Sequence, residues 1–117
     1  MTRVCFQLQV DPSKLDEYRA RHRAVWPSML QEIAASGRRN YSLFLRPDGL
    51  LIGYYETDDA IVGDRYLAAS TVAAEWEAYM GQIFDGIDGR ADQVSVELEE
   101  VFNLEQQLST AAAEDTA

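Results

Sequence analysis

His22, the one histidine of the 117-residue chain, is flanked at helical spacing by two aromatic residues. Tyr18 precedes it by four positions and Trp26 follows it by four. Because successive helical residues rotate by about 100°, the three side chains fall within about 80° on one helix face. An imidazole, with an unperturbed pKa of about 6.5, can give or take a proton near neutral pH. The spacing therefore indicates either a proton-transfer site with aromatic walls or a packed histidine whose nitrogens bind backbone or phenol partners.

The helix that must position these residues is interrupted by a proline. Large side chains recur at three- and four-residue spacing from Leu15 to Ile33, which indicates an amphipathic helix. Pro27 has no amide hydrogen for the carbonyl of Arg23, so we expect a kink, or a restart with Pro27 at the first helical position. Gly37 is typical of a helix end.

Alternating apolar residues predict the strands. The pattern covers residues 4–10 and returns at Val94, Val96 and Leu98, followed by an expected bulge near residues 101–102. Between them, "NYSLFLRPDGLLIGYYE" reads as two strands joined by a Pro-Asp-Gly turn. The pattern thus predicts four strands. The first lies near the N-terminus, the next two form a hairpin, and the last lies near the C-terminus.

Residues 58–81 are predicted to be helical, with Ser70 starting a second segment. We expect Tyr66, Met80, and either Thr71 or Ala74 to point inward. The order is then β-α-β-β-α-β, the arrangement of ferredoxin-like α+β domains, whose antiparallel sheet carries its helices on one face. Apolar residues occur at both odd and even positions of several strands, so both faces of the sheet are expected to be covered. We predict that a second copy of the chain covers the face opposite the helices in a twofold homodimer.

Composition narrows the partners and the compartment. Twenty acidic against ten basic residues give a net charge of −10, which argues against nucleic acid and anionic membranes as partners. Arg38 and Arg39 are therefore interpreted as solvated surface. Cys5 is alone and no leader pattern opens the sequence, which favours a cytoplasmic protein. One histidine and one isolated cysteine argue against a metal site.

One domain is expected over residues 1–104, and residues 105–117, "EQQLSTAAAEDTA", are expected to form a small polar tail outside the core. No phosphate-cradling glycine loop, nucleophile elbow or dinucleotide fingerprint occurs in the sequence. The residues alone therefore point to a small domain without a recognisable cofactor motif.

Four stretches together resemble the L-rhamnose mutarotases, small cytoplasmic enzymes that interconvert the α and β anomers of L-rhamnose. They are "YRARHRAVWP", "NYSLFL", "LAASTVAAEWEAYM" and "ELEEVFNL", spread over residues 3–104. The resemblance implies a dimeric α/β-barrel built from ferredoxin-like halves, a monosaccharide substrate and no cofactor. It also implies that His22 is the proton donor and that Tyr18, Tyr41 and Trp76 contact the sugar, with Trp26 structural.

The chain departs from this family pattern at one position. Family members carry a second tryptophan directly after the one that matches Trp76, where this chain has Glu77. We expect Glu77 to point outward, since helical neighbours lie about 100° apart; the alternative is a hydrogen bond to a sugar hydroxyl. Tyr18, Tyr41 or a bound water are candidates for the second proton transfer, although phenols have a reference pKa near 10.

Two other functions are compatible with the same fold. One is a cofactor-independent oxygenase, or another small-molecule enzyme, on the same dimeric barrel. The other is a sugar-binding protein without catalysis. Anomer exchange requires protonation of the ring oxygen and removal of the proton from the anomeric hydroxyl, for which a general acid typically contributes about 10²- to 10⁴-fold.

Overall fold

A computed structural model describes residues 1–85 and 89–116, without the side chains of residues 92 and 113–116. In this part of the chain four antiparallel strands form one sheet in the order β2-β3-β1-β4. Its strands are β1 (Thr2–Gln9), β2 (Arg39–Leu45), β3 (Leu50–Thr57) and β4 (Val96–Leu98). This topology confirms the ferredoxin-like α+β prediction.

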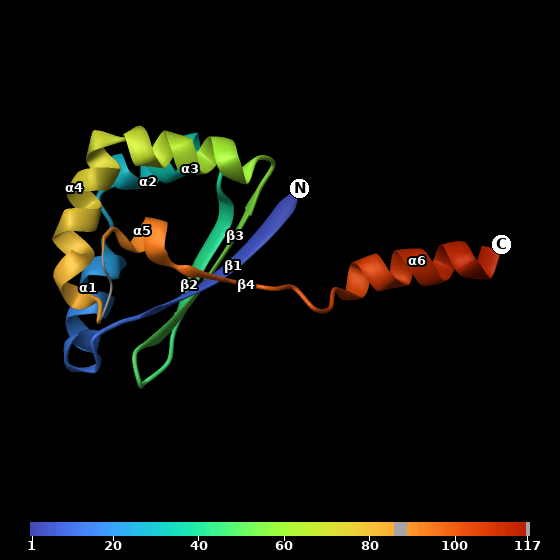
Figure 1. Ribbon diagram of the computed structural model, residues 1–117, viewed down its shortest axis with the longest axis horizontal. Helices are drawn as coiled ribbons and strands as arrows, with labels where there is room; N and C mark the ends of the chain where they lie inside the picture. Colours follow the sequence, from blue (N-terminus) through green and yellow to red (C-terminus); the bar gives the residue numbers. More distant parts are fainter. Residues whose placement is uncertain (86–88, 117) are drawn as a thin grey trace.

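The helices that accompany the sheet lie on one of its faces (Figure 1). They are α1 (Leu15–Arg23), α2 (Pro27–Ala35), α3 (Ala60–Ala69), α4 (Thr71–Met80) and the short α5 (Ala91–Val94), with single 3-10 turns at Pro12–Lys14 and Gly81–Ile83. The predicted restart at Pro27 is confirmed. Trp26 has extended backbone angles (φ −52°, ψ 131°) and Pro27 is the first residue of α2, because a proline is tolerated there without loss of a hydrogen bond.

The predicted hairpin is also confirmed, and its turn depends on a glycine. The Gly49 amide donates to the Arg46 carbonyl at 2.9 Å, and Gly49 has a φ of +93°. A β-carbon there would lie 2.2 Å from the Val10 carbonyl oxygen, so both the backbone angle and the space exclude larger residues.

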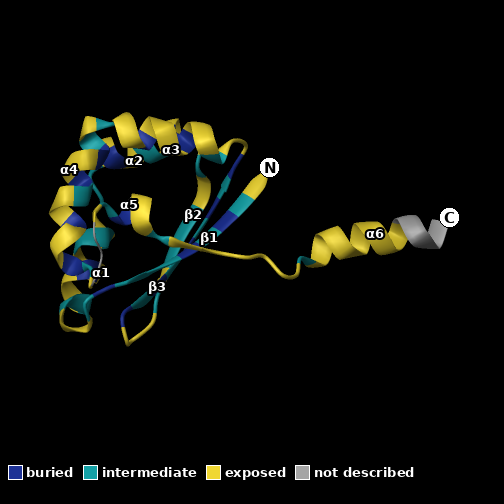
Figure 2. Cartoon of the chain, in the orientation of Figure 1, coloured by how far each residue is buried: buried dark blue, intermediate teal, exposed yellow. Residues whose placement is uncertain are grey.

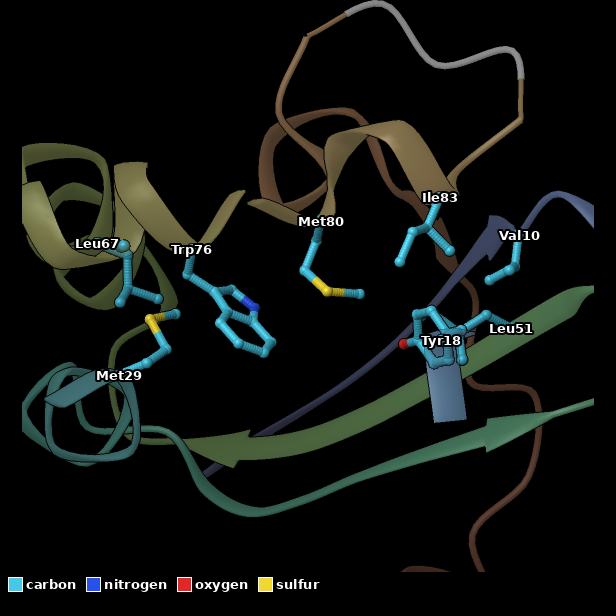
Figure 3. Close-up of a cluster of buried hydrophobic side chains, with 9 residues drawn as sticks. Val10, Tyr18, Met29, Leu51, Leu67, Trp76, Met80 and Ile83 are labelled. Atoms are coloured by element: carbon cyan, nitrogen blue, oxygen red, sulfur yellow. The ribbon is translucent and has the colours of Figure 1, made fainter. Parts of the chain in front are cut away.

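The core consists of two clusters between the sheet and the helices. Tyr18, Leu51 and Trp76 belong to the larger one, shown in Figure 3, and Val4, Phe6 and Tyr55 form the smaller one. In Figure 2 buried residues occur along the strands β1 and β3 and along the helices α2, α3 and α4. A cavity lies between the two layers and is lined by residues of both.

Several predictions about the second helical stretch were wrong. Tyr66 is 40% exposed, and Thr71 and Ala74 are exposed, whereas Leu67 and Ala73 are buried. Two predictions about this stretch are confirmed: Met80 is buried, and a second helix follows Ser70, which is extended (φ −77°, ψ 124°) and caps α4 with its hydroxyl. The prediction extended one helical periodicity from α3 into α4. Because the chain is extended at Ser70, the periodicity does not continue across it, and the buried positions of α4 differ from the predicted ones.

The C-terminal region also differs from the prediction. Val94 ends α5 instead of starting a strand, β4 has only three residues, and residues 99–103 have no regular structure where a bulge was expected. Helix α6 (Leu104–Thr116) projects away from the body of the molecule (Figure 1). Residues 105–112 are exposed, in agreement with a tail outside the core; the domain boundary at residue 104 stays a prediction.

The sheet face opposite the helices carries apolar side chains. Cross-strand pairing joins Cys5 to Leu98, Gln7 to Val96 and Phe44 to Ile52, and paired residues share a face. Phe44 is 64% exposed, Val96 57% and Leu98 37%. In the described part of the chain, this face therefore presents apolar surface.

Candidate functional site

His22 is held by the residue one helical turn before it. Its Nδ1 lies 3.1 Å from the Tyr18 carbonyl oxygen, and the two rings stack with centroids 4.2 Å apart. Because a carbonyl can only accept, this hydrogen bond places a proton on Nδ1. The nitrogen available to exchange a proton with a bound molecule is then Nε2.

Burial changes the acid strength of this pair in opposite ways. Burial lowers the pKa of His22 from its ordinary value of 6.5, and the bond to the Tyr18 carbonyl offsets this only in part. Burial raises the pKa of the Tyr18 phenol, with smaller contributions from Tyr41 and Glu77. At neutral pH the structure therefore favours a neutral imidazole and a protonated phenol.

Trp76 contacts the imidazole, and Trp26 contacts Trp76. The Trp76 ring meets His22 edge to face, with centroids 5.6 Å apart. Trp26 in turn packs edge to face on Trp76 at 5.0 Å and lies 5.3 Å from Tyr79. Edge-to-face contacts at these distances are favourable for aromatic pairs, so Trp26 fixes the position of Trp76, whose own ring lines the cavity described next.

Tyr18, His22, Tyr41 and Trp76, the predicted site residues, all line one cavity of about 340 Å³. They come from three elements, α1, β2 and α4, and the space between sheet and helices brings them together. Tyr41 stacks on Tyr55 at 5.4 Å and meets the edge of Phe6 at 6.3 Å. The structure thus assembles the predicted residues, while their roles stay predictions.

A second cavity of about 480 Å³ shares part of this wall. The residues common to both are His22, Arg38, Tyr41, Leu43, Trp76 and Glu77. Glu77 was predicted to point outward, and this was wrong: it is half-buried and lines both cavities. Both cavities reach Trp76 and the residue that follows it on α4. The replacement of the family's second tryptophan by Glu77 was the sequence signal that could have indicated a cavity-lining position.

Arg38 is the other site residue that the sequence did not predict. It was interpreted as solvated surface, but its side chain is 8% exposed and pairs with Asp64 at 2.8 Å. The Cζ atom of Arg38 lies 4.3 Å from the centre of the Tyr55 ring, within range of a cation–π contact. Its neighbour Arg39 is the solvated one, paired with Asp58 on the surface.

The described residues limit other chemistries. No group of three His, Cys, Asp or Glu side chains suited to a metal ion occurs among them. None of the helices in the same residues is long and apolar enough to cross a membrane. The first cavity is lined in this part of the chain by the carboxylates of Asp64, Glu77 and Glu97 and by the Arg38 guanidinium. Hydroxyls, phenols, indole and carboxylates are groups that suit an uncharged polar molecule.

Fold and site together define a ferredoxin-like α+β protein with an aromatic, polar cavity for a small molecule. The family model described as L-rhamnose mutarotase matches residues 3–104. Relatives named L-rhamnose mutarotase are 33% identical in Listeria monocytogenes and 35% identical in Sinorhizobium fredii, each over 89% of this chain and 99% of its own length. The chain belongs to the L-rhamnose mutarotase family.

Solved structures agree on the fold. The crystal structure of an L-rhamnose mutarotase from Formosa agariphila matches with a TM-score of 0.75 at 24% identity, over 89% of this chain and 99% of that one. A polyketide cyclase from Streptomyces glaucescens, tetracenomycin F2 cyclase, matches with a TM-score of 0.57 at 21% identity, over 89% and 97%. At these identities the likeness extends to the fold alone, and the oxygenase and binding-protein alternatives are not favoured by the family.

Proposed function

We propose that this protein interconverts the α and β anomers of L-rhamnose, with His22 as the proton donor. The observation that carries the proposal is the arrangement of His22, whose Nδ1 is bound to the Tyr18 carbonyl while its ring lines the cavity with Tyr18, Tyr41 and Trp76. One nitrogen is used for orientation, and the other serves the chemistry.

The reaction needs one proton delivered and one removed. In the imidazolium form, Nε2 of His22 donates its proton to the ring oxygen, the bond between that oxygen and the anomeric carbon breaks, and a water molecule takes the proton of the anomeric hydroxyl to give the open-chain aldehyde. After rotation about the adjacent carbon–carbon bond, the ring closes on the other face; the ring oxygen's proton returns to Nε2 and the water returns the other proton to the new anomeric hydroxyl. The lowered pKa of His22 makes its imidazolium a stronger acid.

The remaining side chains hold the sugar. The Trp76 ring offers an apolar face to the C–H side of a pyranose, and Tyr41 and Tyr18 offer phenols to hydroxyls. The raised pKa of Tyr18 argues against this phenol as the acceptor of the second proton. Glu77, which lines the same cavity, is placed to accept a hydrogen bond from a sugar hydroxyl.

A homodimer and a cytoplasmic location are part of the proposal. The apolar sheet face opposite the helices, with Phe44, Val96 and Leu98 exposed, supports a second copy as its cover. The cytoplasm is supported by the single free cysteine, Cys5.

Saturation-transfer NMR between the two anomers of L-rhamnose tests this function. We expect the purified full-length protein to accelerate exchange, and His22→Gln to reduce the enzymatic rate by about 10²- to 10⁴-fold. Arg19→Gln is the control, because Arg19 lies on the same helix and pairs with Asp16 at the surface. A wild-type protein that binds rhamnose without exchange would instead be a binding protein.

A further inference from the structure

Arg38 is a buried cation whose hydrogen-bonding capacity is only partly used. Its side chain is 8% exposed and one terminal nitrogen donates to Asp64 Oδ1 at 2.8 Å. Its Nε is buried and has no hydrogen-bond partner in the described part of the chain. Since nearly all buried polar groups in proteins are hydrogen-bonded, such a donor needs an explanation. Nε itself has almost no accessible surface, so a bound molecule would reach the guanidinium through its terminal nitrogens, and Arg38 lines both cavities.

Arg38 and His22 both line the first cavity, and each packs on a different tyrosine ring. Arg38 covers the ring of Tyr55, which pairs with Val4 of β1. His22 stacks on Tyr18, which belongs to the larger core cluster, whereas Tyr55 belongs to the smaller one, and Leu8 packs against both. Tyr18 and Tyr55 line the same cavity. A molecule bound in this cavity can therefore meet the imidazole with one part of its ring and the guanidinium with another.

The charges around Arg38 indicate the class of ligand. Asp64 neutralises the guanidinium directly, and Glu77 and Glu97 add two more carboxylates to the cavity wall. An anionic ligand would face these carboxylates, whereas a neutral sugar offers hydroxyl oxygens to Arg38 and hydroxyl protons to the carboxylates. The Asp64 bond and the Tyr55 ring also hold the fork of the guanidinium in place before any ligand arrives.

We propose that Arg38 is a specificity-determining residue that donates hydrogen bonds to the sugar hydroxyls remote from the anomeric carbon, with Asp64 as its positioning residue. This inference rests on the proposed anomer exchange, in which His22 acts at the anomeric end. Arg38 and Asp64 then set which sugar is accepted, and the histidine end carries out the proton transfer. Neutral sugars are the substrates of this cavity, and sugar phosphates are excluded.

The test is the concentration dependence of anomer exchange for Arg38→Met, Arg38→Lys and Asp64→Asn, measured by saturation transfer. We expect Arg38→Met to raise KM for L-rhamnose by about 10- to 100-fold, the loss of a hydrogen bond to a charged group, with a much smaller change in kcat. Arg38→Lys restores part of this loss, because an ammonium keeps the charge but not the planar fork. Asp64→Asn gives a smaller rise in KM, again with little change in kcat.

Deoxy sugars separate direct contact from a structural effect. Wild-type protein should discriminate against L-rhamnose lacking the 3- or the 4-hydroxyl, and Arg38→Met should lose that discrimination. Arg39→Met is the matched control, since this neighbouring arginine pairs with Asp58 at the surface. It should behave as wild type with every sugar.

Two results would overturn the inference while leaving the proposed function intact. They are a folded Arg38→Met protein with wild-type KM, or one that keeps the full penalty for both deoxy sugars. If Arg38→Met does not fold, Asp64→Asn decides, because Asp64 is largely exposed; unchanged KM and unchanged deoxy preference in that variant would reject the proposal. Absence of exchange in the wild type would instead reject the proposed function.

Discussion

Phe44→Glu is predicted to separate the two copies of the proposed dimer. Phe44 lies on the sheet face opposite the helices and is 64% exposed in the single chain. With about 200 Å² for a phenylalanine side chain, a partner would cover about 130 Å², worth about 3 kcal/mol at 25 cal/mol per Å². A twofold interface contains the residue twice. Loss of both contacts corresponds to a dissociation constant raised by about 10²- to 10⁴-fold, allowing for incomplete burial.

Sedimentation equilibrium over a range of protein concentrations measures this shift. The matched control is Ile61→Glu, because Ile61 is also 64% exposed but lies on α3, in the helical layer. We expect wild type and Ile61→Glu to be dimers at concentrations where Phe44→Glu is a monomer. A monomeric wild type, or equal dissociation of both variants, would refute the assignment of the dimer interface to this sheet face.

Three further predictions concern the site and its support. The enzymatic exchange rate should fall by about tenfold per pH unit above the pKa of His22, which lies below 6.5 because the ring is buried, and a rate that rises there would contradict a histidine proton donor. Tyr18→Phe keeps the backbone carbonyl that binds His22, so KM should rise by about tenfold while this pH profile is unchanged. Gly53→Ala places a β-carbon 2.1 Å from the Phe6 ring and should destabilise the protein by about 1–3 kcal/mol in urea unfolding, whereas Gly81→Ala, with open space around it, should not.

Local chemistry explains which parts of the fold could be predicted. The restart at Pro27 follows from one missing amide hydrogen, and the hairpin follows from a Pro-Asp-Gly turn, so neither depends on distant residues. The inward face of α4 could not be predicted by extending the pattern of α3. Its phase depends on the extended residue Ser70 between the two helices.

The candidate site also contains residues that local spacing could predict and residues that only the tertiary fold brings together. Tyr18 and His22 share a helix, so spacing alone places them together, whereas Tyr41 and Trp76 join them only through the packing of sheet on helices and were predicted from the resemblance. Arg38 could be predicted neither from helical spacing nor from the resemblance. Its burial depends on Asp64, 26 residues later, and on the ring of Tyr55, and no local pattern distinguishes it from the solvated Arg39.

Arg38, the residue proposed to bind the sugar, and His22, the proposed proton donor, differ in the charged groups around them. Arg38 carries a permanent charge, but Asp64 and the Tyr55 ring compensate it within the wall, so it can donate to a neutral hydroxyl without creating an anion site. Among the residues that the structure describes, no carboxylate is bound to His22; its Nδ1 contacts a backbone carbonyl, and burial lowers its pKa. A carboxylate bound at Nδ1 would stabilise the imidazolium and weaken it as an acid. A carbonyl orients the ring equally well and leaves the proton on Nε2 easy to release.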